Sequence, residues 1–328
     1  MKLIGPVRRE GRYGYITTSG DFAIEPKYEF LDSISEGLII FLVEHKIGFL
    51  NTDGSIKIPA RFESAGQTFP FKSGLACVSC NGKQGYIDTE GNWVIQPTWH
   101  EGWNFLDQMA IVHGDNGYCV IDKRGGIVTN LNVYEVSYWP DWVKDWNCFR
   151  CLFKDGTPDF AHGCVNWRGE IVFAPVHSEL TEFYEGIAGF RDGEQAPDER
   201  WGLVTFSGDI VREPQFFDLK EFYEGLAAAA RDMTPRGKTK GRGYIDVKGN
   251  WQIEPIFNCA KPFSDGLACV SKNQPVNRYG FIDRAGELVI PLIYSSPANF
   301  IEGYAIVEMG DEVHVINKQG SAIYRGPR

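Results

Sequence analysis

Hydrophobic and polar residues alternate along this chain in a pattern that returns every 34 to 44 residues. The segment Gly85-Tyr86-Ile87-Asp88-Thr89-Glu90-Gly91 recurs with few changes at residues 243–249 and 280–286. A near-constant period predicts a series of similar supersecondary units that must stack, because no single unit can bury its apolar face alone. Weaker copies make nine in all, and they begin at Gly14, Gly48, Cys119, Gly163, Gly202 and His314.

Three positions of the motif explain why it should form a β-hairpin. The third is always aliphatic and usually β-branched, which suits a half-buried strand. The seventh is glycine in every copy, and glycine supplies the positive φ of a tight turn. The fourth is Asp, Asn or Thr, whose side-chain oxygens can accept hydrogen bonds from turn amides. Because Asn51 and Thr17 fill the place of Asp88, we interpret this column as structural and not as catalytic carboxylates.

The flanking segments complete the predicted unit. An aromatic residue, a short loop and a strand precede the hairpin, as in residues 183–188 and 222–227. An apolar strand follows it and ends at a proline, as in residues 94–97, because proline lacks a backbone donor and suits a strand end. We therefore predict an all-β fold of tandem three-stranded repeats that forms a single array over residues 1–328, with no helical periodicity.

This pattern resembles the WG-repeat (WG containing repeat) family of bacterial β-repeat proteins. The shared features are an aromatic residue, an acidic-Gly loop, the Gly-Tyr-Ile-Asp hairpin and a closing Ile-x-Pro, and they extend from about Gly11 to Ile323. The Trp-Gly pair that names the family is present at Trp201-Gly202, whereas Tyr13 and Tyr118 occupy the same site in other copies. The resemblance implies all-β repeats with an interaction role, and it provides no catalytic residues to transfer.

The repeats can stack as an open array or close into a ring. The first copy begins almost at its hairpin, with only residues 3–7 available as a leading strand, and the last copy is complete through residues 322–324. Because these two ends do not complement each other, we expect an open, solenoid-like or superhelical array, with a closed β-propeller-like ring as the alternative.

Composition and charge narrow the possible functions. The net charge of −10 argues against broad affinity for nucleic acid or anionic membranes. No segment reaches the roughly 18 apolar residues that a membrane-spanning helix needs, and the first residues contain no secretion signal. The eight cysteines are irregularly spaced and do not indicate a disulfide framework. We expect a cytoplasmic protein.

The long, degenerate unit at about residues 126–162 is the first departure from the pattern. Large aromatic side chains among Pro and Asp residues suit a recognition surface for a protein or a sugar ring. The alternative is that they fill a core that the degenerate repeat has widened. The candidate partner-binding residues are Tyr138, Trp139, Trp142 and Trp146, supported by Trp99 and Trp103 from the preceding segment.

An insertion at residues 231–242 is the second departure, because it is basic in an otherwise acidic chain. It could bind phosphate or an acidic partner, although a solvated loop is the commoner explanation for such a segment. Its basic residues are Arg231, Arg236, Lys238, Lys240 and Arg242.

Searches for catalytic and metal-binding motifs are negative. The six histidines form no metal-ligand motif, and the Cys-x-x-Cys pairs at residues 77–80 and 148–151 lack a compact zinc-site context. No nucleophile elbow or phosphate-binding loop is present. We expect no metal, no cofactor and no enzymatic activity. The leading hypothesis is a scaffold for protein–protein interaction. One version of this hypothesis is an immunity or regulatory protein that blocks a basic partner. Glycan binding is the alternative, and a cryptic hydrolase is the third.

Overall fold

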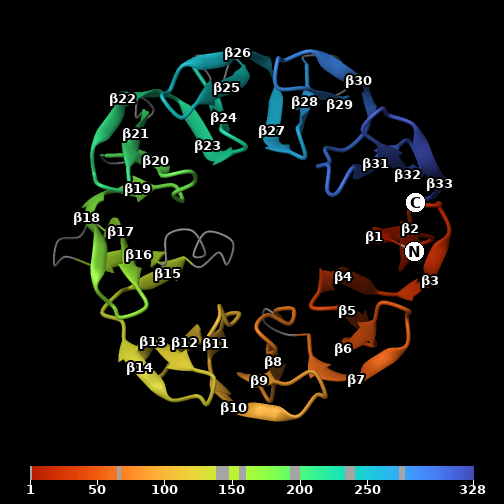
Figure 1. The fold of residues 1–328 in the computed structure, drawn as a ribbon, viewed down its shortest axis with the longest axis vertical. Coiled ribbons are helices and arrows are strands. Elements are labelled where there is room, and N and C mark those ends of the chain that lie inside the picture. Colours follow the sequence, from red (N-terminus) through yellow and green to blue (C-terminus); the bar gives the residue numbers. More distant parts are fainter. Residues whose placement is uncertain are drawn as a thin grey trace. The chain divides into compact units, whose positions relative to one another are not determined.

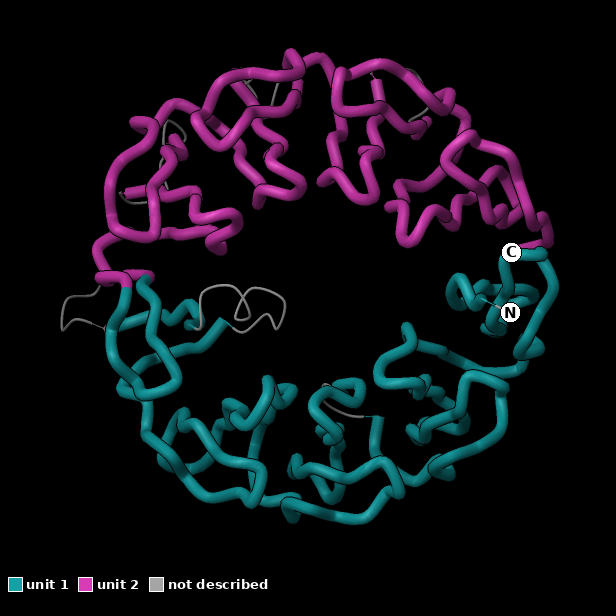
Figure 2. Tube along the Cα trace, viewed as in Figure 1, with its two compact units in different colours: residues 1–158, 163–172 teal, residues 159–162, 173–328 magenta. Residues whose placement is uncertain are grey.

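The structure is a computed structural model that describes residues 2–64, 68–137, 148–154, 160–192, 200–232, 241–272 and 278–328. Every regular element in these ranges is a β-strand (Figure 1), which confirms the all-β prediction. No helix in the described ranges is long and apolar enough to cross a membrane. The chain divides into two compact units: residues 1–158 with 163–172, and residues 159–162 with 173–328 (Figure 2).

Unit 1 contains antiparallel sheets that follow one another in chain order. Its seven-stranded sheet consists of two repeats, because β7 and β8 are joined only through the pairing of Glu63 with Ser79. The first sheet is β1 (Leu3–Arg9), β2 (Arg12–Thr17) and β3 (Phe22–Tyr28). The second is β4 (Phe30–Ser35), β5 (Leu38–Val43), β6 (Lys46–Asn51), β7 (Ile56–Glu63), β8 (Ala76–Cys80), β9 (Lys83–Ile87) and β10 (Trp93–Trp99). Then come β11 (Glu101–Gly102), β12 (Met109–Gly114), β13 (Gly117–Asp122) and β14 (Ile127–Asn130), followed by the pair β15 (Glu135–Ser137) and β16 (Cys148–Lys154).

Strands β17 (Phe160–Asn166) and β18 (Ile171–His177) contain the boundaries between the units. Unit 2 then holds three four-stranded sheets and one three-stranded sheet, each antiparallel. The first consists of β19 (Glu179–Leu180), β20 (Ile187–Arg191), β21 (Trp201–Thr205) and β22 (Ile210–Phe216), and the second of β23 (Asp218–Tyr223), β24 (Leu226–Ala230), β25 (Arg242–Asp246) and β26 (Trp251–Phe257). The third consists of β27 (Cys259–Ser264), β28 (Leu267–Ser271), β29 (Tyr279–Ile282) and β30 (Leu288–Tyr294). The three-stranded sheet consists of β31 (Tyr304–Met309), β32 (Glu312–Asn317) and β33 (Ala322–Pro327).

The prediction of three strands per repeat is wrong for the complete repeats, which have four. The additional strand contains the aromatic residue before the acidic-Gly turn in β23 and β27, and Ile34 takes that place in β4. This strand carries a bulge, for example between Leu31 and Ile34, so its buried residues do not alternate regularly. A period-2 pattern is therefore absent, and the segment looks like a loop in the sequence.

Two apolar cores of unit 1 each lie between two successive repeats. Leu31 and Phe41 of the second sheet pack with Tyr15 of the first, whereas Ile40 and Phe49 pack with residues of β8 and β9. The two faces of a sheet therefore contact different neighbours, because side chains alternate across a strand. This explains why the middle strands are apolar on both faces, as in the fully buried β28.

The hairpin turns have the predicted chemistry. Oδ1 of Asp88 accepts hydrogen bonds from the amides of Glu90 at 3.0 Å and Asn92 at 2.8 Å, and Gly91 has a φ of 84°. The same pair of bonds confirms the structural interpretation of the fourth column at Asp122, Asn166, Asp246, Asp283 and Asn317.

Carboxylates of the acidic-Gly turns link successive repeats. The two carboxylate oxygens of Glu36 accept hydrogen bonds from the amides of Ser73 at 2.7 Å and Gly74 at 2.9 Å, in the next turn of the same kind. In unit 2, Glu224 accepts in the same way from the amide of Gly266. The acidic residue of this motif therefore has a structural role, since it fixes the position of the following repeat.

Candidate functional site

The structure describes two of the six aromatic residues that were predicted to bind a partner. Tyr138, Trp139, Trp142 and Trp146 lie outside the described residues. Trp99 ends β10, in the position that Tyr28 and Phe257 occupy at the ends of their own closing strands. It packs against the core that contains Phe105, and its indole Nε1 is enclosed without a hydrogen-bond partner among the residues that the structure describes. This environment favours a packing role for Trp99.

Trp103 is partly buried within a group of aromatic rings. Its ring centroid lies 6.0 Å from that of Tyr118, which stacks on His113 at 4.4 Å. Its carbonyl accepts a hydrogen bond from the Tyr86 hydroxyl at 2.7 Å. Burial raises the pKa of Tyr118, and the carboxylate of Glu101 adds to the shift. The partly buried indole offers less stacking surface than a fully exposed ring would, so this group is a secondary candidate for binding.

The two described basic residues of the insertion contact other strands of the fold. Arg242 donates from Nε to Oδ2 of Asp218 at 2.7 Å and from Nη1 to the carbonyl of Asn258 at 2.7 Å. Arg231 forms an ion pair with Glu254 at 3.2 Å, and its guanidinium lies 4.9 Å from the centroid of the Trp251 ring. Arg236, Lys238 and Lys240 lie outside the described residues.

The two cysteines of β8, Cys77 and Cys80, lie in different environments. Cys77 is fully buried, and burial raises the pKa of its thiol to about 12, whereas Cys80 is partly exposed. Within the described ranges, no three or more His, Cys, Asp or Glu residues are placed to hold a metal ion.

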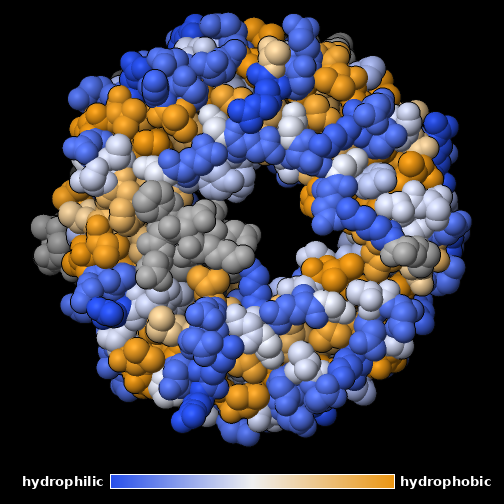
Figure 3. Space-filling view, viewed as in Figure 1, coloured by the Kyte–Doolittle hydropathy of each residue, from blue (hydrophilic) through white to orange (hydrophobic). Residues whose placement is uncertain are grey.

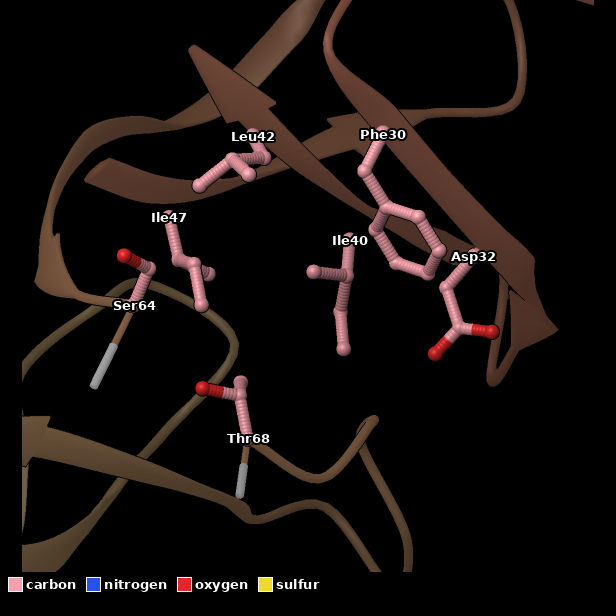
Figure 4. Close-up of a pocket in the computed structure, with 7 residues that line it drawn as sticks. All are labelled: Phe30, Asp32, Ile40, Leu42, Ile47, Ser64 and Thr68. Atoms are coloured by element: carbon pink, nitrogen blue, oxygen red, sulfur yellow. The ribbon is translucent and has the colours of Figure 1, made fainter. Parts of the chain in front are cut away.

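A pocket of about 260 Å³ lies on the face of β4–β7 that is turned toward β8–β10 (Figure 4). The strand register explains its walls, because Phe30 pairs with Leu42 and Leu42 pairs with Ile47, so all three side chains share one face. Asp32 and Ile40 lie on the same face, two residues along their strands. Ser64 and Thr68, from the chain after β7, line the opposite side.

The polar groups of the pocket have few protein partners. Oδ1 of Asp32 accepts from the amide of Ser33 at 2.7 Å, and Asp32 forms no ion pair within the described residues. Oγ1 of Thr68 is enclosed and makes no hydrogen bond there. The Phe30 side chain is 43% exposed at the entrance. The sequence did not indicate these residues, because the strand that carries Phe30 and Asp32 was not itself predicted.

The closing strands of the repeats expose aliphatic side chains in a recurring pattern. In unit 1, Ile56 and Ile127 are 60% and 57% exposed, and in unit 2 Ile210 and Ile256 are 52% and 58% exposed. On the face drawn in Figure 3, hydrophobic areas alternate with hydrophilic ones along each unit. These side chains stand at the first, second or sixth place of a closing strand, and together they provide exposed apolar area that a partner could cover. Further members of this set, which we call the aliphatic row, are Val94, Val128, Ile171, Val172, Val176, Leu288, Val289 and Ile293.

Solved structures share this fold at low sequence identity. A eukaryotic initiation factor matches with a TM-score of 0.68 and 12% identity, over 100% of this chain and 96% of that chain. The dipeptidyl peptidase 4 of Porphyromonas gingivalis matches with a TM-score of 0.53 and 10% identity, over 90% of this chain and 59% of that chain. The dihydro-heme d1 dehydrogenase NirN in complex with DHE matches with a TM-score of 0.50 and 13% identity, over 93% of this chain and 75% of that chain. At such identities the similarity is one of fold.

Sequence comparison identifies the repeat itself. No curated protein matches the chain. The family model for the WG containing repeat matches five segments that together exceed half of the chain, at residues 13–46, 47–83, 85–118, 243–274 and 279–312. These segments contain the hairpin motif, the positive-φ glycine and the closing strand described above. The chain therefore belongs to the family of proteins built from the WG containing repeat.

Proposed function

We propose that this chain is a non-enzymatic scaffold that binds another protein through the aliphatic row on its closing strands. The observation that carries the proposal is the recurrence of these exposed side chains, from Ile56 in unit 1 to Ile293 in unit 2. The closing strands other than β14 also contain a proline, such as Pro255 in β26, which limits strand addition at the sheet edge. The partner therefore contacts side chains and does not extend the sheet.

Charge indicates the kind of partner. The chain has 43 acidic and 33 basic residues, and a net charge of −10 favours a basic protein. Rim charges act mainly on the rate of association, so binding should weaken with salt. An immunity or regulatory protein that blocks a basic partner in the cytoplasm fits this combination.

Affinity capture from source lysate tests the proposal. The native chain is compared with the triple variant Ile210→Ser, Ile256→Ser, Leu288→Ser, which removes exposed apolar area in unit 2. The matched control replaces exposed polar residues, with Gln96→Ser, Gln215→Ser and Gln319→Ser. The captured protein is then purified, and its affinity is measured at several salt concentrations. Loss of binding in the first variant alone supports the proposal. Equal binding by all three proteins, or reconstitution of a hydrolytic or glycan-binding activity that needs no protein partner, contradicts it.

The arrangement of the repeats along the whole chain is part of the same proposal. The sequence favours the open, superhelical array, and both the first and the last sheet have three strands, β1–β3 and β31–β33. The distance between spin labels at Lys2 and Arg328 distinguishes this array from the ring. A long distance supports the open array, and a short one supports the closed propeller-like ring.

A further inference from the structure

One set of positions that pair across neighbouring strands differs between the sheets in a way that indicates a ligand. We refer to this set only as the row of paired positions, and it is separate from the aliphatic row. The row contains the paired residues Phe30, Leu42 and Ile47 in the second sheet. The pairing of Glu179 with Arg191 places these two residues in the same row of the sheet β19–β22. In the sheet β23–β26, Asp218 pairs with Ala230, which pairs with Arg242.

Arginine fills this row in two of the four sheets of unit 2, β19–β22 and β23–β26, whereas the sheet β27–β30 has Cys259, Ser271 and Tyr279 there. Arg191 forms an ion pair with Glu179, and its guanidinium lies 5.2 Å from the centroid of the Trp201 ring. Arg242 pairs with Asp218 at 2.7 Å. The row thus accommodates a guanidinium between a carboxylate and either an aromatic ring or a backbone carbonyl.

The sheet β11–β14 fills the row with aromatic rings. Glu101 pairs with His113, which pairs with Tyr118, and Trp103 lies beside them on the same face. The stacked His113 and Tyr118 rings, together with the Trp103 ring, occupy the volume.

The second sheet leaves the corresponding volume open. Leu42 and Ile47 stand at the places of His113 and Tyr118 and carry no ring, and a pocket of about 260 Å³ lies beside them (Figure 4). The carboxylate of Asp32 and the aromatic ring of Phe30 are nevertheless present, as the Glu179 carboxylate and Trp201 ring are around Arg191. A partly buried carboxylate without a cationic partner among the described residues is the complement of an incoming cation.

We propose that this pocket binds the arginine side chain of a basic partner protein. The aliphatic stem of the arginine packs against Ile40, Leu42 and Ile47. Its guanidinium pairs with Asp32 and lies against the Phe30 ring, and a donor from it satisfies Oγ1 of Thr68. The volume lies below the range of about 300–1,000 Å³ that is usual for drug-sized ligands, so a single side chain fits it. The assignment of the arginine to a partner protein rests on the proposed function, whereas the specificity of the pocket for a cation does not.

Methyl NMR of the full chain tests the pocket directly. Ile40, Ile47 and Leu42 provide methyl reporters inside it, and the variants Ile40→Val and Ile47→Val assign their signals. The probes are butylguanidinium, a blocked Gly-Arg-Gly tripeptide and the same tripeptide with citrulline, which is neutral. Both cationic probes are expected to shift the pocket methyl signals, and the tripeptide is expected to bind more tightly than butylguanidinium.

The variant Asp32→Asn should weaken binding of the arginine tripeptide about tenfold or more, because a charge-assisted hydrogen bond is lost. Asp311→Asn is the matched control, since Asp311 is an exposed carboxylate outside the pocket, and it should leave binding unchanged. Phe30→Leu gives a second reading if Asp32→Asn fails to fold, and it should weaken binding by loss of the ring.

Equal binding of the citrulline and arginine tripeptides would overturn the cation assignment. Failure of every probe to shift the pocket methyl signals would overturn the pocket as a site, and it would leave the capture experiment for the aliphatic row unaffected. Tighter binding of butylguanidinium than of the tripeptide would overturn the partner side chain as the source and point to a free small cation.

Discussion

Arg242 donates from Nε to Oδ2 of Asp218 at 2.7 Å, and it extends to the carbonyl of Asn258 through Nη1, so one side chain joins β23, β25 and the chain that enters β27. The pair is largely buried, with side-chain exposures of 29% for Arg242 and 18% for Asp218. Asp218→Asn keeps the shape of the side chain and removes its charge. We expect the free energy of unfolding to fall by about 2 kcal/mol, as measured by urea denaturation at pH 7. Asp311→Asn, an exposed change of the same type, should leave it unchanged, and an equal loss in both variants would contradict this role.

The same pair predicts a pH dependence. Burial raises the pKa of Asp218, but the hydrogen bond from Arg242 and the charges of Lys220 and Arg242 outweigh this and lower the pKa below its usual value. The unfolded chain, with an Asp pKa of about 3.9, then binds more protons, so stability rises with pH in this range. The contribution of Asp218 is fully present above the unfolded pKa and is lost as the pH falls through the folded pKa. Urea denaturation from pH 6 to pH 3 should show a shallower loss for Asp218→Asn than for the native chain, and parallel curves would refute the assignment.

The turn glycines provide a matched pair of substitutions. Gly91 and Gly208 both have a positive φ, of 84° and 90°. An added Cβ at Gly91 would lie 3.1 Å from Cγ2 of Ile58, whereas one at Gly208 would meet no atom within 4 Å. Both alanine variants should lose about 1 kcal/mol or more from backbone strain, and Gly91→Ala should lose more because Ile58 must move. Thermal unfolding of the two variants checks this order, and the reverse order would exclude Ile58 as the cause.

Cysteine reactivity should differ between Cys77 and Cys80. Burial raises the pKa of Cys77 to about 12, and the thiolate is the reactive form. Treatment of the folded chain with iodoacetamide at pH 8, followed by peptide mass spectrometry, should show modification of the partly exposed Cys80 and protection of Cys77. Modification of both at similar rates in the folded chain would contradict the burial of Cys77, and both should react once the chain is unfolded in urea.

Thr68 connects stability with the pocket. Its Oγ1 is enclosed without a hydrogen bond among the described residues, so replacing it with a methyl group costs no protein contact. Thr68→Val should keep or raise the free energy of unfolding, and it should weaken binding of the arginine tripeptide. A clear loss of stability would show that the hydroxyl is required by the fold itself.

The sequence predicted the elements that depend on local chemistry. Gly91 and Asp88 identify a hairpin because a positive φ and a side-chain acceptor act within one turn. The segment of Phe30 and Asp32 was not recognised as a strand, because its bulge disrupts the alternation of buried residues. The sequence indicated that the insertion is basic, but it could not indicate that Arg242 pairs with Asp218 in another strand.

The sequence by itself therefore determined the repeat, its hairpins and its all-β character, because these follow from spacing and from the conformational preferences of single residues. Only the tertiary structure decided which row positions are filled and which remain open. Arg191 and Arg242 fill their rows from within the chain, whereas the row of Phe30 leaves a pocket beside Asp32. That difference depends on strand register and on the volumes of side chains from separate strands. These relations arise only when the strands pair and the sheets pack.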